Sequence, residues 1–281
     1  MNPRILIAVV VGLVLVAVGG FIFALLPPTN DALRSTALPP AQTATPSSAA
    51  VPAVLPLPPA APPMATSASI EAELALSEHA ELQALLKKNF NQEYNELIAM
   101  AARRRNEGVS DQAFAQALNE RFQDIMRGKL KYGAGASMAA IDRLAANEAS
   151  LFHALGTEGA ALCLKMLGQD DAPAAAATPE SVRQLMQLGT LYRFQAIVEG
   201  MPNAKPAESL TSDEKRAFEA SLAREGLNFK DVSSGAYLNK GSAGPGKPCL
   251  TLETLHLAIA RLAERTRRKI YAGMFFLDRD R

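Results

Sequence analysis

The chain has 281 residues, with 29 Lys and Arg against 28 Asp and Glu, a formal net charge of +1. This length allows one or two domains with a sizeable core. The balanced charge excludes a general electrostatic preference for nucleic acid, so we expect no nucleic-acid partner. Trp is absent while Ala and Leu are abundant, which favours helices over a β-sandwich.

An apolar segment begins at the fifth residue. Residues 5–26 contain no charge, no proline and no strongly polar side chain. As a helix rising about 1.5 Å per residue, they would span the roughly 30 Å hydrocarbon core of a bilayer. A cleaved signal peptide is the alternative, but the run exceeds the usual apolar length of about 7–15 residues and no good cleavage site follows closely. We therefore expect residues 1–26 to be an uncleaved transmembrane anchor that contacts the lipid bilayer through residues 5–26.

The charges around this segment indicate its orientation. Arg4 precedes it, and the first charges after it are Asp31 and Arg34. The positive-inside rule then places the N-terminus in the cytoplasm and the rest of the chain outside. Together with the Ala- and Pro-rich tract that follows, this predicts a single-pass protein of the bacterial inner membrane with its C-terminal domain in the periplasm.

A proline-rich linker is expected at residues 27–66. It contains eleven prolines and only two charged residues. Proline removes a backbone donor and clashes with the preceding helical turn, so this stretch is predicted to be a disordered, partly extended spacer. Its reach is between about 35 Å as a flexible coil and roughly 120 Å when extended. Residues 67–281 then form the extracytoplasmic domain.

The remainder of the chain shows helical periodicity and no sustained alternation of period two. The fold class expected is all-α, a bundle-like domain of about seven helices. The segment 157–167 is apolar nearly all round and is expected to be central and buried. The apolar runs lie at residues 82–101, 114–125, 138–155, 157–167, 179–200, 211–222 and 251–270.

Residues typical of helix ends frame these runs. Ser110 and Ser137 are predicted N-caps, and Pro179 is placed at the first helical position after Thr178. Residues 211–214, Thr-Ser-Asp-Glu, have the spacing of a capping box. The last helix is expected to start at Thr251.

The chain has two cysteines, Cys163 and Cys249. In an extracytoplasmic domain they predict one disulfide. Two unconnected buried thiols are the alternative, because free cysteine is commonly buried. A redox or nucleophilic role is not expected, because there is no Cys-x-x-Cys and no histidine beside either thiol in sequence.

A glycine-rich stretch at residues 241–247 nearly spells the phosphate-binding loop of nucleotide hydrolases, G-x-x-x-x-G-K. Such a loop needs Ser or Thr after the Lys to bind Mg²⁺, whereas this chain has Pro248 there. Pro245 and Pro248 also lack the backbone N–H groups that would hold phosphate. We interpret the stretch as the connector that delivers Cys249 to Cys163.

Metal and cofactor motifs are incomplete. Glu253 and His256 have the Glu-x-x-His spacing of helical di-iron sites, but a second such pair is missing. His79 and His153 have no Glu three residues before them. No hydrolase signature of the His-Glu-x-x-His or Gly-x-Ser-x-Gly type is present. We therefore expect no metal, no cofactor and no assignable catalytic residue.

Glu148 is the acidic residue that most resembles a catalytic group, because it lies in an apolar run near aromatic residues. A glycosidase needs only two acids at a suitable separation and leaves no motif. An exposed helix glutamate is the ordinary alternative at this position. An enzyme that acts on a cell-envelope polymer through carboxylates therefore remains an alternative function.

Two basic clusters occur, at residues 103–105 and at 265–269. Both are interpreted as solvated faces in or near the final turns of helices, where cations oppose the helix dipole favourably. Residues 274–277, Met-Phe-Phe-Leu, cannot all face one side of a helix. Met274, Phe275, Phe276 and Leu277 are thus either a partner-binding patch or a segment that docks on the protein's own core.

The leading functional hypothesis is a membrane-anchored extracytoplasmic helical module that binds a protein partner, within an envelope assembly. It rests on the anchor, the linker and the lack of catalytic motifs.

Overall fold

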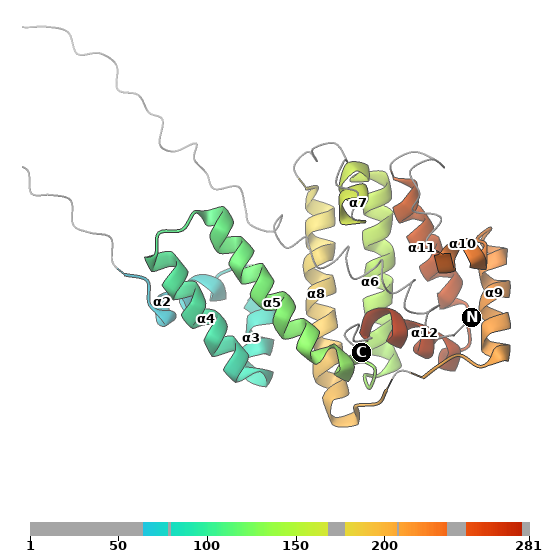
Figure 1. The fold of residues 1–281 in the computed structure, drawn as a ribbon, viewed down its shortest axis with the longest axis horizontal. Coiled ribbons are helices and arrows are strands. Elements are labelled where there is room, and N and C mark those ends of the chain that lie inside the picture. The colour runs from blue at the N-terminus through green and yellow to red at the C-terminus, as the bar shows by residue number, and fades with distance from the viewer. Residues whose placement is uncertain (1–63, 78–79, 168–177, 207, 235–245, 277–281) are drawn as a thin grey trace, which may run out of the picture.

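The computed structural model describes residues 64–77, 80–167, 178–206, 208–234 and 246–276, and Figure 1 shows them as an all-helical fold. The predicted anchor and all but the last three residues of the predicted linker lie outside these ranges. No helix within them is long and apolar enough to cross a membrane. The α-helices there are α2 (Ser67–Ala75), α3 (Ala80–Asn89), α4 (Asn91–Asn106), α5 (Asp111–Gly133), α6 (Met138–Thr157), α7 (Ala160–Met166), α8 (Glu180–Gly200), α9 (Ser212–Arg224), α10 (Phe229–Ser234), α11 (Lys247–Ala260) and α12 (Glu264–Phe276).

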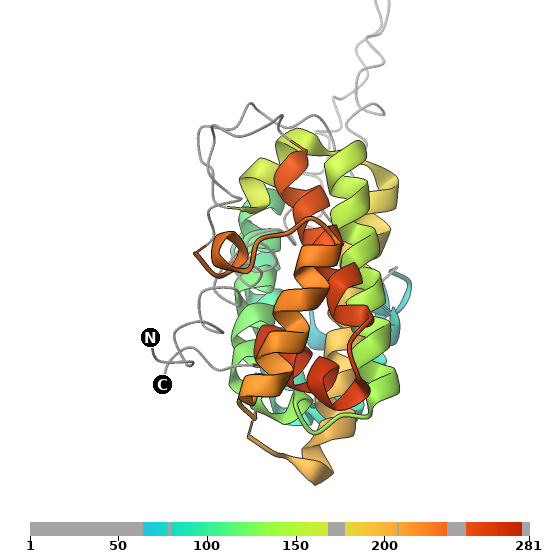
Figure 2. The same ribbon diagram turned by 90° about the vertical axis from the view of Figure 1, so that its right-hand side faces the viewer.

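The helices form an upright bundle with an N-terminal arm beside it. In Figure 1, α6, α8, α9 and α11 stand side by side, and successive ones run in opposite directions. Helix α6 packs against both α8 and α11. Helices α2, α3 and α4 form the arm, and α5 runs from the arm to the foot of the bundle, where α12 crosses. Figure 2 shows α9 and α11 in front of this bundle.

The short helix α7 lies at the opposite end of the bundle from α12 (Figure 1). It was expected to be central, but only one face is fully buried, through Leu162, Cys163 and Met166. A helix at the end of a bundle has neighbours on one side only, so Lys165 on its outer face is exposed. The prediction that this segment is buried is therefore correct for one face of α7, whereas the prediction that it lies at the centre of the fold is wrong.

The predicted N-caps are largely confirmed. The hydroxyls of Ser110 and Ser137 accept hydrogen bonds from the backbone N–H groups of Ala113 and Ala140, at 3.2 Å each. Thr211 and Glu214 form the predicted capping box at the start of α9. These contacts are local in sequence and could be predicted from it.

The number of helices exceeds the prediction of about seven. The described chain has eleven α-helices and no strand, because two predicted helices are broken and α2 and α10 were not predicted. Phe90 breaks the first with a non-helical backbone, φ −135° and ψ 51°, and residues 261–263 break the last. Phe90 is buried and packs edge-on against Phe194. The apolar stripe therefore continues across the break, so the hydrophobic periodicity of the sequence does not reveal the break.

Two predicted helix starts are displaced. Helix α11 begins at Lys247, with a proline in its first turn, and Thr251 lies one turn inside it. The Thr251 hydroxyl donates to the Lys247 carbonyl at 3.0 Å rather than capping the helix. Pro179 is the N-cap residue of α8 and not its first helical residue. In both helices the proline lies at the start, where a backbone N–H has no intrahelical acceptor, so no helical hydrogen bond is lost.

Candidate functional site

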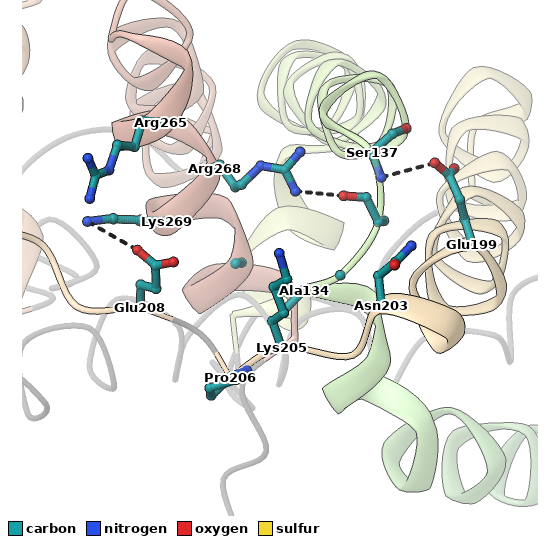
Figure 3. A pocket seen from close by; sticks show the side chains of 13 residues that line it. Ala134, Ser137, Glu199, Asn203, Lys205, Pro206, Glu208, Arg265, Arg268 and Lys269 are labelled. Carbon is teal, nitrogen blue, oxygen red and sulfur yellow. Dashed lines mark hydrogen bonds and ion pairs between the residues drawn. The ribbon is translucent and has the colours of Figure 1, made fainter.

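A pocket of about 520 Å³ lies at the foot of the bundle (Figure 3). Its walls come from the connection between α5 and α6, the end of α8 with the 3-10 helix η3 (Met201–Asn203), the segment after η3, and α12. The antiparallel course of the bundle brings these segments together, because α6 starts and α8 ends at this end. The pocket is lined by Ala134, Gly135, Ala136, Ser137, Glu199, Asn203, Lys205, Pro206, Glu208, Arg265, Arg268, Lys269 and Ala272.

Close backbone contact between two helix ends forms one side of the pocket. A Cβ atom on Gly200, the last residue of α8, would collide with the Tyr132 carbonyl. A Cβ atom on Gly135 would lie 2.7 Å from the Gly200 carbonyl oxygen, which is too short for a real contact. Glycine is therefore required at both positions so that the backbones of the two helix ends can approach each other.

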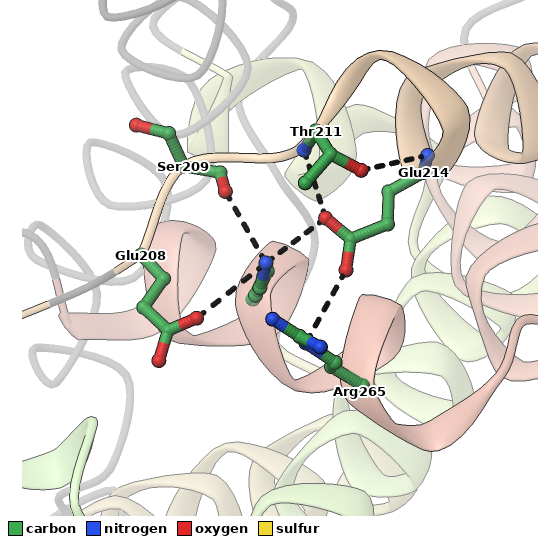
Figure 4. A network of polar contacts seen from close by, with 6 residues as sticks. Glu208, Ser209, Thr211, Glu214 and Arg265 are labelled. Atoms are coloured by element: carbon green, nitrogen blue, oxygen red, sulfur yellow. Dashed lines mark hydrogen bonds and ion pairs between the residues drawn. The ribbon is translucent and has the colours of Figure 1, made fainter.

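Lys269 of α12 supports the opposite wall. Its side chain is only 6% exposed. The Lys269 ammonium donates to Glu214 Oε2 at 2.9 Å and to the Ser209 carbonyl at 3.4 Å, and it lies 3.4 Å from Glu208 Oε2. Figure 4 shows these contacts with the Thr211–Glu214 capping box. This lysine is neutralised by its own protein and serves to tie α12 to the start of α9.

Glu214 has two structural functions. Its Oε2 atom accepts the Thr211 backbone N–H at 2.8 Å and also the Lys269 ammonium. These bonds, with the Thr211 amide first, hold the pKa of the Glu214 carboxyl below its usual value. Arg265 adds a weaker contact, 3.8 Å from Glu214 Oε1, from a side chain that is 78% exposed.

Arg268 differs from Lys269 because it lacks an acidic partner in the described part of the chain. Its Nη1 donates to the Ala136 carbonyl at 2.6 Å, and its side chain is half-buried. A carbonyl orients the guanidinium but does not neutralise it. Lys205, on the segment after η3, is exposed and has no ion pair with any described residue. Among the described residues, two cations of the pocket, Arg268 and Lys205, thus have no counter-ion.

Both carboxylates of the pocket have a partner in the protein, Glu199 a hydrogen bond and Glu208 an ion pair. Glu199 accepts the backbone N–H of Ser137 at 3.0 Å, at the start of α6, where a negative charge is favoured by the helix dipole. Glu208 lies beside Lys269. Four cationic side chains and two carboxylates line the pocket, an excess of positive charge.

Glu148, the candidate acid, lies in the core and not in this pocket. It forms an ion pair with Arg193 of α8, and the two side chains are 3% and 1% exposed. Burial raises the pKa of the Glu148 carboxyl, and the Arg193 charge opposes that rise. The expectation of an exposed helix glutamate is wrong, because α8 supplies a buried partner 45 residues along the chain.

The Glu-x-x-His pair does not act as a unit. His256 is buried against two aromatic rings, and its ring centroid lies 5.7 Å from that of Tyr271 and 6.1 Å from that of Phe275. Burial lowers the pKa of His256 to about 4. Glu253 instead faces His153 on α6, whose Nδ1 is 3.1 Å from both carboxylate oxygens. No group of three or more metal-ligating side chains occurs among the described residues.

The disulfide between Cys163 and Cys249 is present and joins α7 to the start of α11. Both cysteines are buried. A Cβ atom on Gly246 would collide with the Gly156 carbonyl, so the two segments touch through backbone beside the disulfide. Gly246 and Lys247 of the glycine-rich stretch thus belong to a structural junction, while residues 241–245 lie outside the described chain.

The C-terminal apolar segment is buried. Met274, Phe275 and Phe276 are at most 2% exposed, and Leu277 lies outside the described residues. Helix α12 packs against α5, α6 and α11, so it has partners on several sides. This corrects the prediction of a partner-binding patch at the three described positions, where the alternative of docking on the core applies.

The two basic clusters differ in position. Residues 103–105 occupy the last turn of α4, as predicted. Residues 265–269 were expected near the end of a helix but lie in the first half of α12, because α11 and α12 are separate helices. Arg267 of this cluster donates to Asp142 with two 2.9 Å bonds and to the carbonyls of Ala260 and Leu262 at the end of α11.

Arg265, Arg268 and Lys269 belong to a basic cluster that is visible in the sequence, whereas the other side of the pocket has no such signal. Lys205, Ala136 and Glu199 carry no motif. The only available signal was the pair of glycines before Ser137 together with Gly200, which indicates close backbone contact.

A comparison of the chain with models of protein families, with curated proteins and with solved structures finds no match.

Proposed function

We propose that this chain is a single-pass, membrane-anchored extracytoplasmic module that acts by binding an envelope partner, and that the pocket at the foot of the bundle is its binding site. The observation that carries this proposal is the pocket's chemistry. Its carboxylates are engaged in structural bonds, whereas Arg268 and Lys205 have no acidic partner among the described residues. An uncompensated cation in a cavity is available to a ligand.

The proposed compartment rests on separate observations. Residues 5–26 have the length and composition of a membrane anchor, and residues 27–66 those of a spacer. The disulfide between Cys163 and Cys249 is typical of an oxidising compartment such as the periplasm. A phosphatase fused after the last residue should be active in this arrangement, and an inactive fusion would contradict it.

An enzyme acting on a cell-envelope polymer is the second candidate. It is favoured only by the presence of Glu199 and Glu208 in one pocket. Both carboxylates are held by other groups, the Ser137 amide and the Lys269 ammonium. A general acid must be free to reach the substrate, whereas both carboxylates already contact groups of the protein itself. The contacts therefore support binding over catalysis.

Crosslinking in intact cells tests the binding proposal. A photo-reactive amino acid at Asn203, exposed on the pocket rim, should give a discrete adduct. The same group at Gln92, exposed on α4 in the arm, is the control and should not give that adduct. Equal labelling from both positions, or none from Asn203, would contradict the proposal.

A further inference from the structure

Arg268 bonds one backbone carbonyl and has no acidic partner in the described chain. One guanidinium nitrogen is fixed by the Ala136 carbonyl at 2.6 Å, while its other N–H groups have no partner in the described chain. A half-buried guanidinium has lost part of its hydration, so an anion that reaches its remaining N–H groups is favoured. The carbonyl bond also limits the motion of the guanidinium, so little side-chain entropy remains to be lost when an anion binds.

Lys205 supplies a second positive charge. Figure 3 shows its side chain pointing from the segment after η3 into the space between α12 and the α5–α6 connection. Lys269, by contrast, already has Glu208 and Glu214 as partners. The cations free to bind a ligand are therefore Arg268 and Lys205, with the exposed Arg265 at the edge.

We propose that the pocket binds a phosphoryl group, held by Arg268 and Lys205. A phosphoryl group carries up to two charges and three acceptor oxygens, so it can satisfy both cations at once, whereas a carboxylate offers one charge. The pocket volume of about 520 Å³ exceeds that of a single phosphate. The phosphoryl group is therefore carried by a larger molecule, either a lipid headgroup or a soluble phosphate ester. This inference rests on the proposal that the pocket is a binding site.

Calorimetric titration of the full chain in neutral detergent tests the chemistry. The probes are inorganic phosphate, glycerol 3-phosphate and, as the uncharged control, glycerol. Phosphate and glycerol 3-phosphate should bind and glycerol should not. Dihexanoyl phosphatidate and dihexanoyl phosphatidylcholine distinguish the two sources. A lipid headgroup predicts that the phosphatidate binds more tightly than glycerol 3-phosphate, and a soluble ester predicts the reverse order.

Variants assign the binding to the two cations. Arg268→Gln should weaken phosphate binding by about tenfold or more, the loss expected for one charge-assisted contact. Lys205→Gln should weaken it by about two- to fivefold. Because Lys205 is exposed and has no hydrogen bond or ion pair with a described residue, its variant should keep the fold, and the test remains valid if Arg268→Gln is unstable. Arg104→Gln, on α4 and paired with Glu107, is the matched control and should bind as the wild type does.

Failure of this inference is distinguishable from failure of the proposed function. If no phosphate probe binds the wild type, or if both pocket variants bind like Arg104→Gln, the phosphoryl inference is overturned. A discrete adduct from Asn203 in intact cells would then leave the pocket as a binding site for another ligand. Absence of that adduct would overturn both the phosphoryl inference and the proposed binding function.

Discussion

Glu148 on α6 and Arg193 on α8 form an ion pair in the centre of the core, with almost no exposure of either side chain. The Arg193 guanidinium also lies 6.0 Å from the centre of the Phe275 ring of α12. The pair therefore connects α6, which begins at the pocket, to α8, which ends there. It also lies close to α12, which forms one wall of the pocket.

Removing one member of this pair should destabilise the fold strongly. Glu148→Gln leaves a buried guanidinium without a counter-ion, and we expect a loss of about 3–5 kcal/mol in the free energy of unfolding. The double variant Glu148→Leu with Arg193→Met should recover most of that loss. Chemical unfolding followed by circular dichroism measures both. Arg127→Met, at an exposed pair with Asp124, is the control and should cost under about 1 kcal/mol. A single-variant loss as small as the control's would contradict this assignment.

His256 should make stability depend on pH. Its pKa is about 4 in the folded chain and about 6.5 when unfolded. The unfolded state therefore takes up the proton first, and stability present above pH 6.5 is lost as the pH falls toward 4. The linkage amounts to roughly 3 kcal/mol over that window. His256→Phe should remove this part of the pH dependence, and His153→Gln, at an exposed position, should not. The unfolding midpoints of the wild type and the two variants between pH 4 and 7 measure this dependence.

Glu214 should contribute stability only when it is ionised. Its pKa is lowered in the folded state, so its contribution is present above the unfolded pKa of about 4.3 and is lost as the pH falls through the folded value. Glu214→Gln should cost about 1–2 kcal/mol at pH 7. The difference from the wild type should vanish in acid. Glu219→Gln, at the exposed pair with Lys215, should have little effect at any pH. A pH-independent difference at Glu214 would count against the ionic role.

Gly200 should not tolerate alanine. The added Cβ would collide with the Tyr132 carbonyl, so we expect Gly200→Ala to cost about 2 kcal/mol or more. Gly128, inside the last third of α5, has nothing within 4 Å of the same position. Gly128→Ala should therefore stabilise the chain by about 0.5–1 kcal/mol, because alanine favours the helix. Thermal unfolding of the two variants should shift in opposite directions.

Reduction of the disulfide should lower stability without abolishing the helices at once. The bond joins residues 86 apart, and the chain-entropy model gives about 4–5 kcal/mol for a loop of this length. Cys163→Ser with Cys249→Ser should lower the unfolding midpoint to the same extent as reduction does in the wild type. A double-serine variant as stable as the oxidised protein would show that the bond is absent in solution.

The local features of the fold could be predicted from the sequence because they depend on neighbouring residues. The capping box at residues 211–214 and the serine caps are of this kind. The disulfide could be predicted despite its span because the chain has only two cysteines. The break at Phe90 could not, because its side chain packs on Phe194 and remains on the apolar stripe, so the hydrophobic pattern does not change at the break.

The pocket was beyond sequence reasoning for a different reason. Ala136 contributes only its backbone carbonyl, and Lys205 contributes a charge that only the fold places in the pocket. Neither residue type therefore indicates its role. Arg268 was assigned to a solvated cluster together with Arg267 and Lys269. The three side chains have different partners, namely a carbonyl, Asp142 and Glu214. That difference depends on contacts between helices that are distant in sequence.

The most direct measurement compares crosslinking from Asn203 in the wild type and in the Arg268→Gln background, in intact cells. If the pocket is the binding site and Arg268 holds the ligand, the Asn203 adduct should fall in the variant, by about tenfold where the wild-type site is far from saturated, while protein level and the disulfide remain unchanged. An adduct of equal yield in both backgrounds would contradict the claim that this pocket binds its partner through Arg268.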